Sequence, residues 1–162
     1  MEKSEMLRTA MPSAVHSAGI DLVDLCRWDL AVARTKGELL QRVFSEAERT
    51  AARHTAADGA TSPERTLGRA FGVKEGVVKA VGGLPPGACL KDIQVEIAPG
   101  EQPWPVRLHG ELGHWAARHD VEMVGGAHEL GDDMAAAWAA AHPRTNRPRT
   151  DRPGADRDGE SS

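Results

Sequence analysis

The order of the expected secondary-structure elements predicts an α+β domain, in which helices pack on a mostly antiparallel sheet. An alternating apolar segment stands near the start of the chain, and a largely helical region follows it. Further alternating segments then make up most of the second half. A length of 162 residues accommodates one ordinary domain of this kind.

The first half of the chain is predicted to be one strand followed by helices. Residues 15–23 alternate as a strand does, and helical spacing follows over residues 29–34 and 37–44. Ser45 is suited to cap the next helix, because acidic residues would occupy its first turn. A long helix is expected to begin with proline in its first position, at Pro63, and to end at a pair of glycines.

The second half is predicted to complete the sheet. Strands are expected over residues 89–98 and 104–110, followed by a short helix, and the remaining segments plausibly close the sheet. The alanine-rich segment 134–141 fits a strand or a helix equally well. Residues 1–13 are expected to form a flexible arm, and the composition of 142–162 indicates a disordered tail. The domain itself is therefore predicted to span residues 14–141.

Composition excludes several classes of protein. A formal net charge of −4 is atypical of a general nucleic-acid-binding protein, which carries a basic excess. No apolar segment is long enough to span a bilayer or resembles a secretory leader, so we expect no membrane association. Cys26 and Cys89 lie far apart without a CxxC pattern, which indicates reduced thiols. We therefore expect a cytoplasmic protein.

Residues 27–53 form a mildly basic segment in this acidic chain. It contains six basic and four acidic residues: Arg27, Arg34, Lys36, Arg42, Arg49 and Arg53 against Asp29, Glu38, Glu46 and Glu48. Such a segment fits a surface that faces an acidic partner. An ordinary solvated helical surface would show the same pattern, so both interpretations stay open.

The sequence AGIDLVDLCRW carries a carboxylate at the centre of an apolar strand. Alternation places Asp21 and Val23 on one face and Ile20 and Leu22 on the other. A buried charge is costly unless it is paired. Asp21 is therefore either a solvent-facing residue of an edge strand or a ligand of a cation.

The long helix carries a second polar pair in the sequence FGVKEGVVKAVGG. Glu75 and Lys79 are four residues apart, which places them on one helix face in the favourable orientation. A simple surface ion pair is one interpretation. The other is a functional site, because the neighbouring residues Phe71, Val77, Val78 and Val81 leave only a narrow polar stripe.

Taken together, the motifs of this chain resemble those of the holo-acyl-carrier-protein synthases, the small 4'-phosphopantetheinyl transferases. The sequences GIDLVDLCRW, RVFSEAE, FGVKEGVVKAVGG, DIQVEI and VRLHG follow in that family's order, and the resemblance covers residues 15–141. It implies transfer of phosphopantetheine from coenzyme A to a serine of an apo acyl carrier protein, with release of 3',5'-ADP. It also implies a homotrimer with active sites at the subunit interfaces.

The resemblance assigns roles to individual residues. Asp21 and Glu75 match the carboxylates that hold Mg²⁺, an ion that accepts one or two carboxylates together with phosphate and water oxygens. Their convergence on one ion would explain why neither needs a side-chain salt bridge. Lys79 matches the lysine that neutralises the leaving phosphate, in a reaction that depends on positioning and charge. The base is either Glu75 or a metal-held water.

Further roles concern the two substrates. The resemblance implies that His128 and Lys74 contact coenzyme A. It also places Arg27 and Arg34 where the family presents basic residues to the acidic helix of the carrier protein, which serves fatty-acid or polyketide synthesis.

Several residues depart from the family pattern. The S-x-S-H motif is replaced by VGGAHEL, which keeps His128 but loses the hydroxyls. The arginine expected directly before the helix phenylalanine is Ala70, and Arg69 stands one position earlier, about 100° around the helix. These changes leave two alternatives to the enzyme: a degenerate member that binds carrier protein or partners without transfer, and a member repurposed to act on a carrier-bound intermediate.

Overall fold

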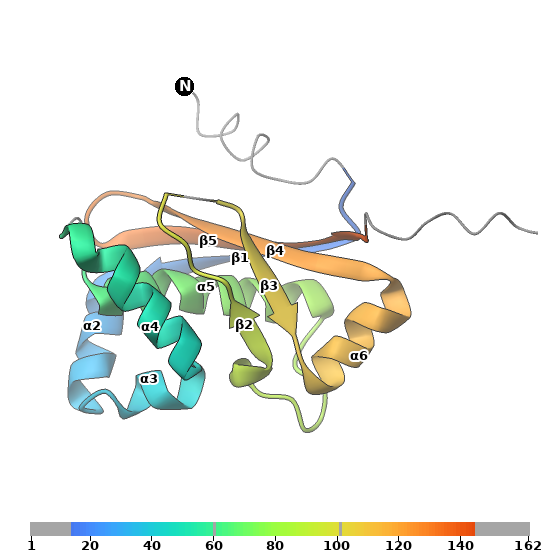
Figure 1. The fold of residues 1–162 in the computed structure, drawn as a ribbon, viewed down its shortest axis with the longest axis horizontal. Helices are drawn as coiled ribbons and strands as arrows, with labels where there is room; N and C mark the ends of the chain where they lie inside the picture. Colours follow the sequence, from blue (N-terminus) through green and yellow to red (C-terminus); the bar gives the residue numbers. More distant parts are fainter. Residues whose placement is uncertain (1–13, 60, 101, 145–162) are drawn as a thin grey trace, which may run out of the picture.

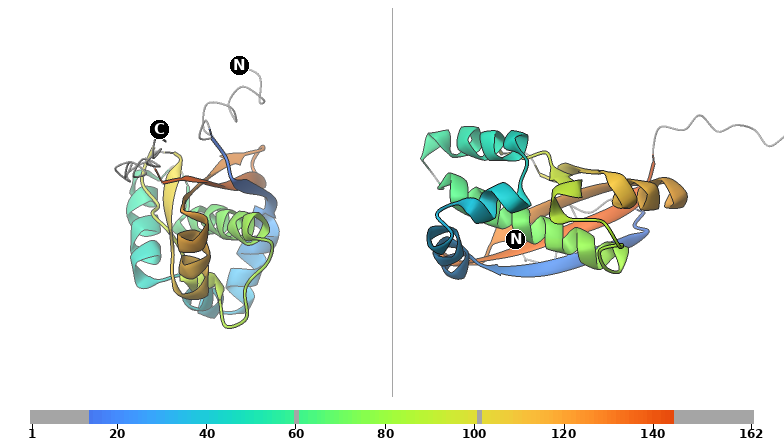
Figure 2. Two further views of the ribbon diagram at one scale, coloured as in Figure 1. Left: turned by 90° about the vertical axis from the view of Figure 1, so that its right-hand side faces the viewer. Right: turned by 90° about the horizontal axis from the view of Figure 1, so that it is seen from below.

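Five antiparallel strands form one sheet in the order β1-β5-β4-β3-β2, and the helices lie against one of its faces (Figure 1). The computed structural model describes residues 14–59, 61–100 and 102–144. Seen from below, the helices stand in front of the sheet, with α5 along it and α6 at one end (Figure 2). This arrangement confirms the predicted α+β class.

The elements and their bounds are β1 Ser17–Asp24, α2 Leu25–Arg34, α3 Glu38–Val43, α4 Glu46–Thr55, α5 Pro63–Val81, β2 Ile93–Val95, β3 Trp104–Leu108, α6 Gly110–His119, β4 Val121–Glu129 and β5 Met134–Pro143. Two short 3-10 turns, Ala56–Asp58 and Leu90–Asp92, precede α5 and β2. None of the helices in the described ranges is long and apolar enough to cross a membrane.

Side-chain caps explain where the helices begin. The Ser45 hydroxyl accepts a hydrogen bond from the backbone N–H of Glu48, and the Glu48 carboxylate accepts one from the backbone N–H of Ser45. Helix α5 begins with proline, as predicted. The start of α2 differs from the prediction. Asp24 accepts a hydrogen bond from the backbone N–H of Arg27 (2.9 Å), so the helix begins at Leu25 and not near residue 29.

The alanine-rich segment forms β5, which settles the choice between strand and helix. β5 lies between β1 and β4 and pairs with both along its length. Its small side chains suit a central position under α5, because they let the helix approach the sheet closely. The strand continues to Pro143, so the predicted start of the tail at residue 142 is wrong. The predictions for residues 1–13 and for the tail beyond Arg144 lie outside the described residues.

The two faces of the sheet differ in what covers them. Gly19, Asp21 and Val23 face α5, as the alternation of the strand requires. Ile20 and Leu22 point to the opposite face, which we call the outer face, and they are 55% and 62% exposed. The prediction that Asp21 and Val23 share a face is confirmed, and two large apolar side chains are left in contact with solvent.

Candidate active site

Glycines bring α5 into direct contact with β1. A Cβ atom on Gly19 would lie 2.0 Å from the carbonyl oxygen of Gly76 and 2.7 Å from the Cβ of Lys79. A Cβ on Gly76 would meet the backbone of β5 at 3.0 Å. No larger residue fits at Gly19 without moving the helix. This close approach places the polar stripe of α5 directly over the carboxylate of Asp21.

Lys79 binds the strand through two hydrogen bonds. Its Nζ donates to Oδ1 of Asp21 (2.8 Å) and to the backbone oxygen of Ile20 (2.8 Å). The side chain of Asp21 is 21% exposed and that of Lys79 is 50% exposed, so solvent reaches the pair. The expectation that neither carboxylate needs a salt bridge is therefore wrong for Asp21. A lysine ammonium balances its charge in this structure.

Glu75 completes the cluster on the preceding turn of α5. Burial raises the pKa of its carboxyl group, the negative charge of Asp21 raises it further, and Lys79 lowers it. The two carboxylates are therefore close enough to repel one another. The structure brings Asp21, Glu75 and Lys79 together, as the motifs predicted.

The donor set of this cluster fits Mg²⁺. Two carboxylates that disfavour each other's charge would be stabilised by a divalent cation between them, and Mg²⁺ takes few protein ligands and completes its shell with water and phosphate. Within the described residues, no group of three or more His, Cys, Asp or Glu side chains could hold a metal ion. Asp21 and Glu75 could supply two protein ligands of an ion whose other ligands are water and substrate oxygens.

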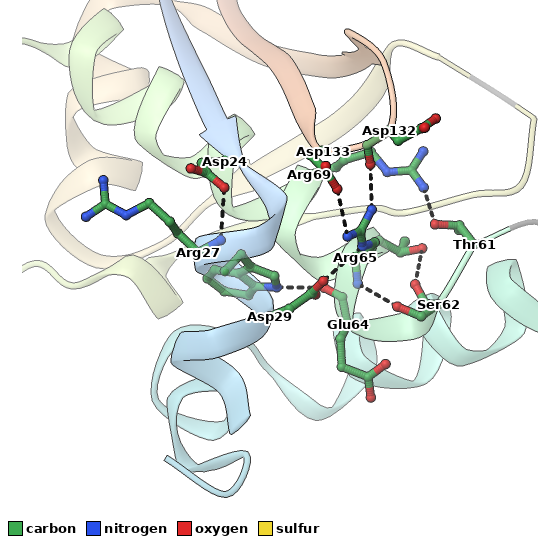
Figure 3. A network of polar contacts seen from close by, with 12 residues as sticks. Asp24, Arg27, Asp29, Thr61, Ser62, Glu64, Arg65, Arg69, Asp132 and Asp133 are labelled. Carbon is green, nitrogen blue, oxygen red and sulfur yellow. Dashed lines mark hydrogen bonds and ion pairs between the residues drawn. The ribbon is translucent and has the colours of Figure 1, made fainter. Parts of the chain in front are cut away.

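A hollow of about 380 Å³ adjoins the cluster. Asp21 lines one part of it and Arg27 another, and its apolar wall includes Trp28 and Phe71, whose rings stack with centroids 5.1 Å apart. Arg27 is exposed, and its side chain points away from the neighbouring polar contacts (Figure 3). Arg34 is exposed on the same face of α2, seven residues further on. The hollow thus connects the carboxylate cluster to the predicted docking helix.

His128 lies on the other side of the sheet. It pairs with Ala136 of β5, which pairs with Leu22, whereas Asp21 pairs with Ala137. Because side chains alternate along a strand, His128 is on the outer face and Asp21 faces α5. Its Nε2 atom is buried and has no hydrogen-bond partner in the structure. A single chain therefore does not bring His128 to the carboxylate cluster.

Lys74 is fully buried, which contradicts the prediction that it contacts coenzyme A. Its Nζ donates to the carboxylate of Glu48 (2.9 Å) and to the backbone oxygens of Val43 (2.9 Å) and Leu90 (3.1 Å). Burial lowers the pKa of Lys74, and the Glu48 carboxylate opposes that shift. The lysine is adjacent to Glu75 in sequence, but the turn of the helix directs it into the interior.

Arg69 is a candidate that the motif analysis noted only as a departure. It lines a cavity of about 240 Å³ with Thr55, Thr61 and Thr66. The guanidinium donates to the hydroxyl of Thr61 (2.8 Å) and pairs with Glu129 (3.4 Å). The Nε atom of Arg69 and the hydroxyl of Thr55 are buried without a partner in the structure. The sequence offered one indication of this candidate: Arg69 stands one position before the place, directly preceding Phe71, where the family pattern has an arginine.

Comparison with known proteins identifies the class that this fold and cluster define. The family model of the 4'-phosphopantetheinyl transferase superfamily matches residues 17–139. The chain therefore belongs to the 4'-phosphopantetheinyl transferase superfamily, and the resemblance inferred from the motifs is confirmed.

Curated relatives narrow the comparison to one kind of enzyme within that class. A holo-[acyl-carrier-protein] synthase of Frankia alni is 37% identical over 108 residues, which are 67% of this chain and 80% of the relative. A protein of the same name from Rhodospirillum centenum is 40% identical over 124 residues, or 75% of this chain and 88% of the relative.

Solved structures share the fold. Holo-[acyl-carrier-protein] synthase from Neisseria meningitidis has a TM-score of 0.62 at 18% identity, covering 79% of this chain and 98% of its own. Acyl carrier protein synthase from Mycobacterium tuberculosis is 26% identical with a TM-score of 0.54, covering 81% of this chain and 100% of its own. These likenesses confirm the predicted phosphopantetheinyl transferase-like fold.

Proposed function

We propose that this chain transfers the 4'-phosphopantetheine group of coenzyme A to a serine of an apo acyl carrier protein and releases 3',5'-ADP. The observation that carries the proposal is the cluster of Asp21, Glu75 and Lys79 beside the hollow that reaches Arg27. The names of the relatives support the same activity. Both fatty-acid and polyketide carriers fit this substrate class. The cytoplasmic location stays a prediction, supported by two free cysteines.

The proposed reaction depends on charge neutralisation more than on covalent protein chemistry. Mg²⁺ held by Asp21 and Glu75 would neutralise the pyrophosphate of coenzyme A. The serine oxygen of the carrier attacks the phosphorus that bears pantetheine, and the bond from that phosphorus to the bridging oxygen breaks. Lys79, half exposed and within reach of solvent, turns from Asp21 and neutralises the charge on the leaving phosphate.

Glu75 is the proposed proton acceptor for the serine hydroxyl. Burial raises the pKa of its carboxyl group, which favours proton uptake, whereas Mg²⁺ would offset the contribution of the Asp21 charge. Only the ionised form accepts a proton. On this assignment, transfer decreases as the pH falls through the pKa that Glu75 has in the Mg²⁺-loaded enzyme.

A direct assay tests the proposed activity. The purified chain is incubated with coenzyme A, Mg²⁺ and several apo carrier proteins, and each carrier is weighed by mass spectrometry. We expect the mass of a carrier to increase by one phosphopantetheine group, and no increase when Mg²⁺ is chelated. Carrier binding without any mass gain would favour the degenerate member instead, an alternative motivated by the lost hydroxyls of the sequence VGGAHEL.

Arg27 and Arg34 are proposed to bind the acidic carrier protein. Both are exposed on one face of α2, next to the hollow that leads to Asp21. Reversing both charges, Arg27→Glu with Arg34→Glu, is expected to raise the KM for the carrier about tenfold or more, because like charges would then face each other. The KM for coenzyme A serves as the internal control. An unchanged carrier KM, measured at low salt, would remove α2 from the docking surface.

A homotrimer with sites at subunit interfaces is also part of the proposal. Two observations support a partner on the outer face: Ile20 and Leu22 are exposed there, and His128 stands on that face, away from Asp21. A neighbouring copy that covers the outer face would bury the apolar side chains. Because β1 is an edge strand, a contact that sets the β1 edge of one copy against the outer face of the next would also bring His128 toward the neighbour's carboxylate cluster.

Mixing two inactive variants tests the shared site. Asp21→Ala and His128→Ala are each expected to lose transfer, because each removes one half of every composite site. Co-refolding them in equal amounts is expected to restore part of the activity, since some interfaces then combine an intact Asp21 with an intact His128. Mass by light scattering reports the assembly. Complete inactivity of mixed, assembled oligomers would argue against sites built from two chains.

We extend the proposed coenzyme contacts to Arg69. Its unpartnered Nε and the unpartnered hydroxyl of Thr55 line one cavity, and a phosphate oxygen would satisfy both. Arg69 is bound to Glu129, the neighbour of His128 in β4. Hydrogen bonds from Arg69 and Thr55 to such a phosphate would compensate for the hydroxyls that the sequence VGGAHEL lacks.

A further inference from the structure

Arg65 connects three elements through one guanidinium group (Figure 3). It stands in the first turn of α5, and its Nε donates to Asp29 of α2 (3.0 Å). Its Nη1 donates to the backbone oxygen of Asp132 (2.6 Å), and its Nη2 bonds the carboxylate of Asp133 (3.3 Å). Asp132 and Asp133 form the turn between β4 and β5. Arg65 therefore holds α2 against this turn.

The turn at Asp133 is a well-anchored point. Its backbone oxygen accepts a hydrogen bond from the N–H of Leu25 (2.8 Å), and interaction with its carboxylate raises the pKa of the Cys26 thiol. β4 and β5, which the turn joins, pair without interruption up to it. A side chain bound to this turn is therefore bound to the sheet itself.

Asp29 adds a side-chain attachment to α2. Besides the backbone bond of Leu25 at its first residue, the helix is held by Trp28, whose Nε1 donates to the backbone oxygen of Glu64 (2.7 Å) and whose indole packs over Gly68 of α5. Successive residues of a helix point about 100° apart, so Trp28 and Asp29 hold different sides of α2. The backbone bond of Leu25 holds only the first residue of α2, and Trp28 holds one side of the helix. The link through Asp29 holds a second side and therefore limits rotation of the helix about its axis.

We propose that Arg65 is a positioning residue for carrier recognition. By holding Asp29 against the β4–β5 turn, it fixes the rotation of α2 and therefore the direction in which Arg27 and Arg34 face. The inference rests on the proposed function, because it requires α2 to be the surface that binds the carrier. Arg65 itself touches neither substrate.

The direction in which two substitutions change carrier binding separates this positioning role from an effect of charge alone. Arg65→Gln and Asp29→Asn both break the link, so both are expected to weaken binding of an apo acyl carrier protein about fivefold. If charge alone mattered, Asp29→Asn would strengthen binding of the acidic carrier. The double variant is expected to bind no more weakly than the weaker single variant, because both remove one link. Arg65→Lys keeps the charge without the planar fork and is expected to resemble Arg65→Gln.

Direct binding and transfer are measured on the same full-length proteins. The Kd for a purified apo acyl carrier protein comes from titration calorimetry, and kcat and the KM for coenzyme A are expected to stay within about twofold of wild type. Arg107→Gln is the control, because it removes the same charge from an exposed arginine that pairs with Glu96 and lies outside the basic segment 27–53. It is expected to leave the Kd unchanged. Thermal unfolding and circular dichroism establish that each variant is folded.

The outcomes distinguish the inference from the proposed function. Tighter carrier binding by Asp29→Asn, wild-type binding by Arg65→Lys, or wild-type binding by both single variants would overturn the positioning role while transfer by the wild type stands. A wild-type chain that neither binds nor modifies any apo carrier would overturn the proposed function, and the positioning role with it.

Discussion

Replacing Lys74 by methionine is expected to lower the free energy of unfolding by about 3–5 kcal/mol. Lys74 and Glu48 are both fully buried, and the Nζ atom of Lys74 lies 2.9 Å from Oε1 of Glu48. Glu48 also accepts hydrogen bonds from the backbone N–H groups of Ser45 (2.8 Å) and Val95 (3.0 Å), so the pair links α4, α5 and β2. Without Lys74, the carboxylate of Glu48 stays in the interior without a counter-charge, and that is the origin of the loss.

Chemical denaturation monitored by circular dichroism measures this change. The control is Arg42→Met, which removes an exposed partner of Glu38 (3.6 Å) and is expected to cost less than about 1 kcal/mol. The double variant Lys74→Met with Glu48→Gln is expected to regain part of the lost stability, because no isolated charge then remains inside and the glutamine oxygen can still accept from the backbone. Equal losses from Lys74→Met and Arg42→Met would contradict the buried-pair account.

The largest expected effect on activity comes from the carboxylate cluster. Asp21→Ala and Glu75→Ala are each expected to reduce phosphopantetheine transfer about 1,000-fold or more, since each removes a proposed ligand of the Mg²⁺ ion that would neutralise the reacting phosphates. Both variants are expected to stay folded, because both side chains lie at a solvent-accessible site. Full transfer by either variant would remove the metal-site argument.

The stability of Glu75 variants gives a readout that does not depend on activity. The folded-state pKa of Glu75 is raised, so protonated Glu75 favours the folded state. This contribution is complete below the unfolded-state pKa and is lost as the pH rises through the folded-state pKa. At neutral pH without metal, Glu75→Gln is therefore expected to raise the Tm, and at acidic pH the difference from wild type is expected to vanish.

Mg²⁺ provides the complementary measurement. Adding it is expected to raise the Tm of the wild type, because the ion binds the folded chain and relieves the repulsion between Asp21 and Glu75. The same addition is expected to leave the Tm of Glu75→Gln nearly unchanged. A monovalent chloride salt at the same ionic strength controls for the screening of charges. An identical Mg²⁺ response in both proteins would place the ion elsewhere.

Local sequence signals predicted much of this fold. The cap at Ser45, the proline at the start of α5 and the glycines at its end act within one or two helical turns, so they are readable without knowledge of the rest of the chain. The alanine-rich segment was ambiguous because alanine suits both helix and a crowded central strand. Pairing with β1 and β4, which no local pattern reveals, made it a strand.

For the candidate site, too, some features were predictable from the sequence and others depended on the tertiary structure. The resemblance of the motifs to those of the holo-acyl-carrier-protein synthases predicted that Asp21, Glu75 and Lys79 belong to one site. Residue type and spacing by themselves left both Asp21 and the Glu75–Lys79 pair with two interpretations. Only the tertiary structure decided that Lys79 pairs with Asp21, because the approach of α5 to β1 depends on contacts between distant glycines.

The same holds for the substrate contacts. Lys74 points inward because the packing of α5 decides which of its sides is buried. His128 and Asp21 stand on opposite faces because of the register of β1, β5 and β4, where a shift of one residue would exchange the faces. The sequence motifs predict the reacting groups, and long-range packing decides which of them one chain brings together.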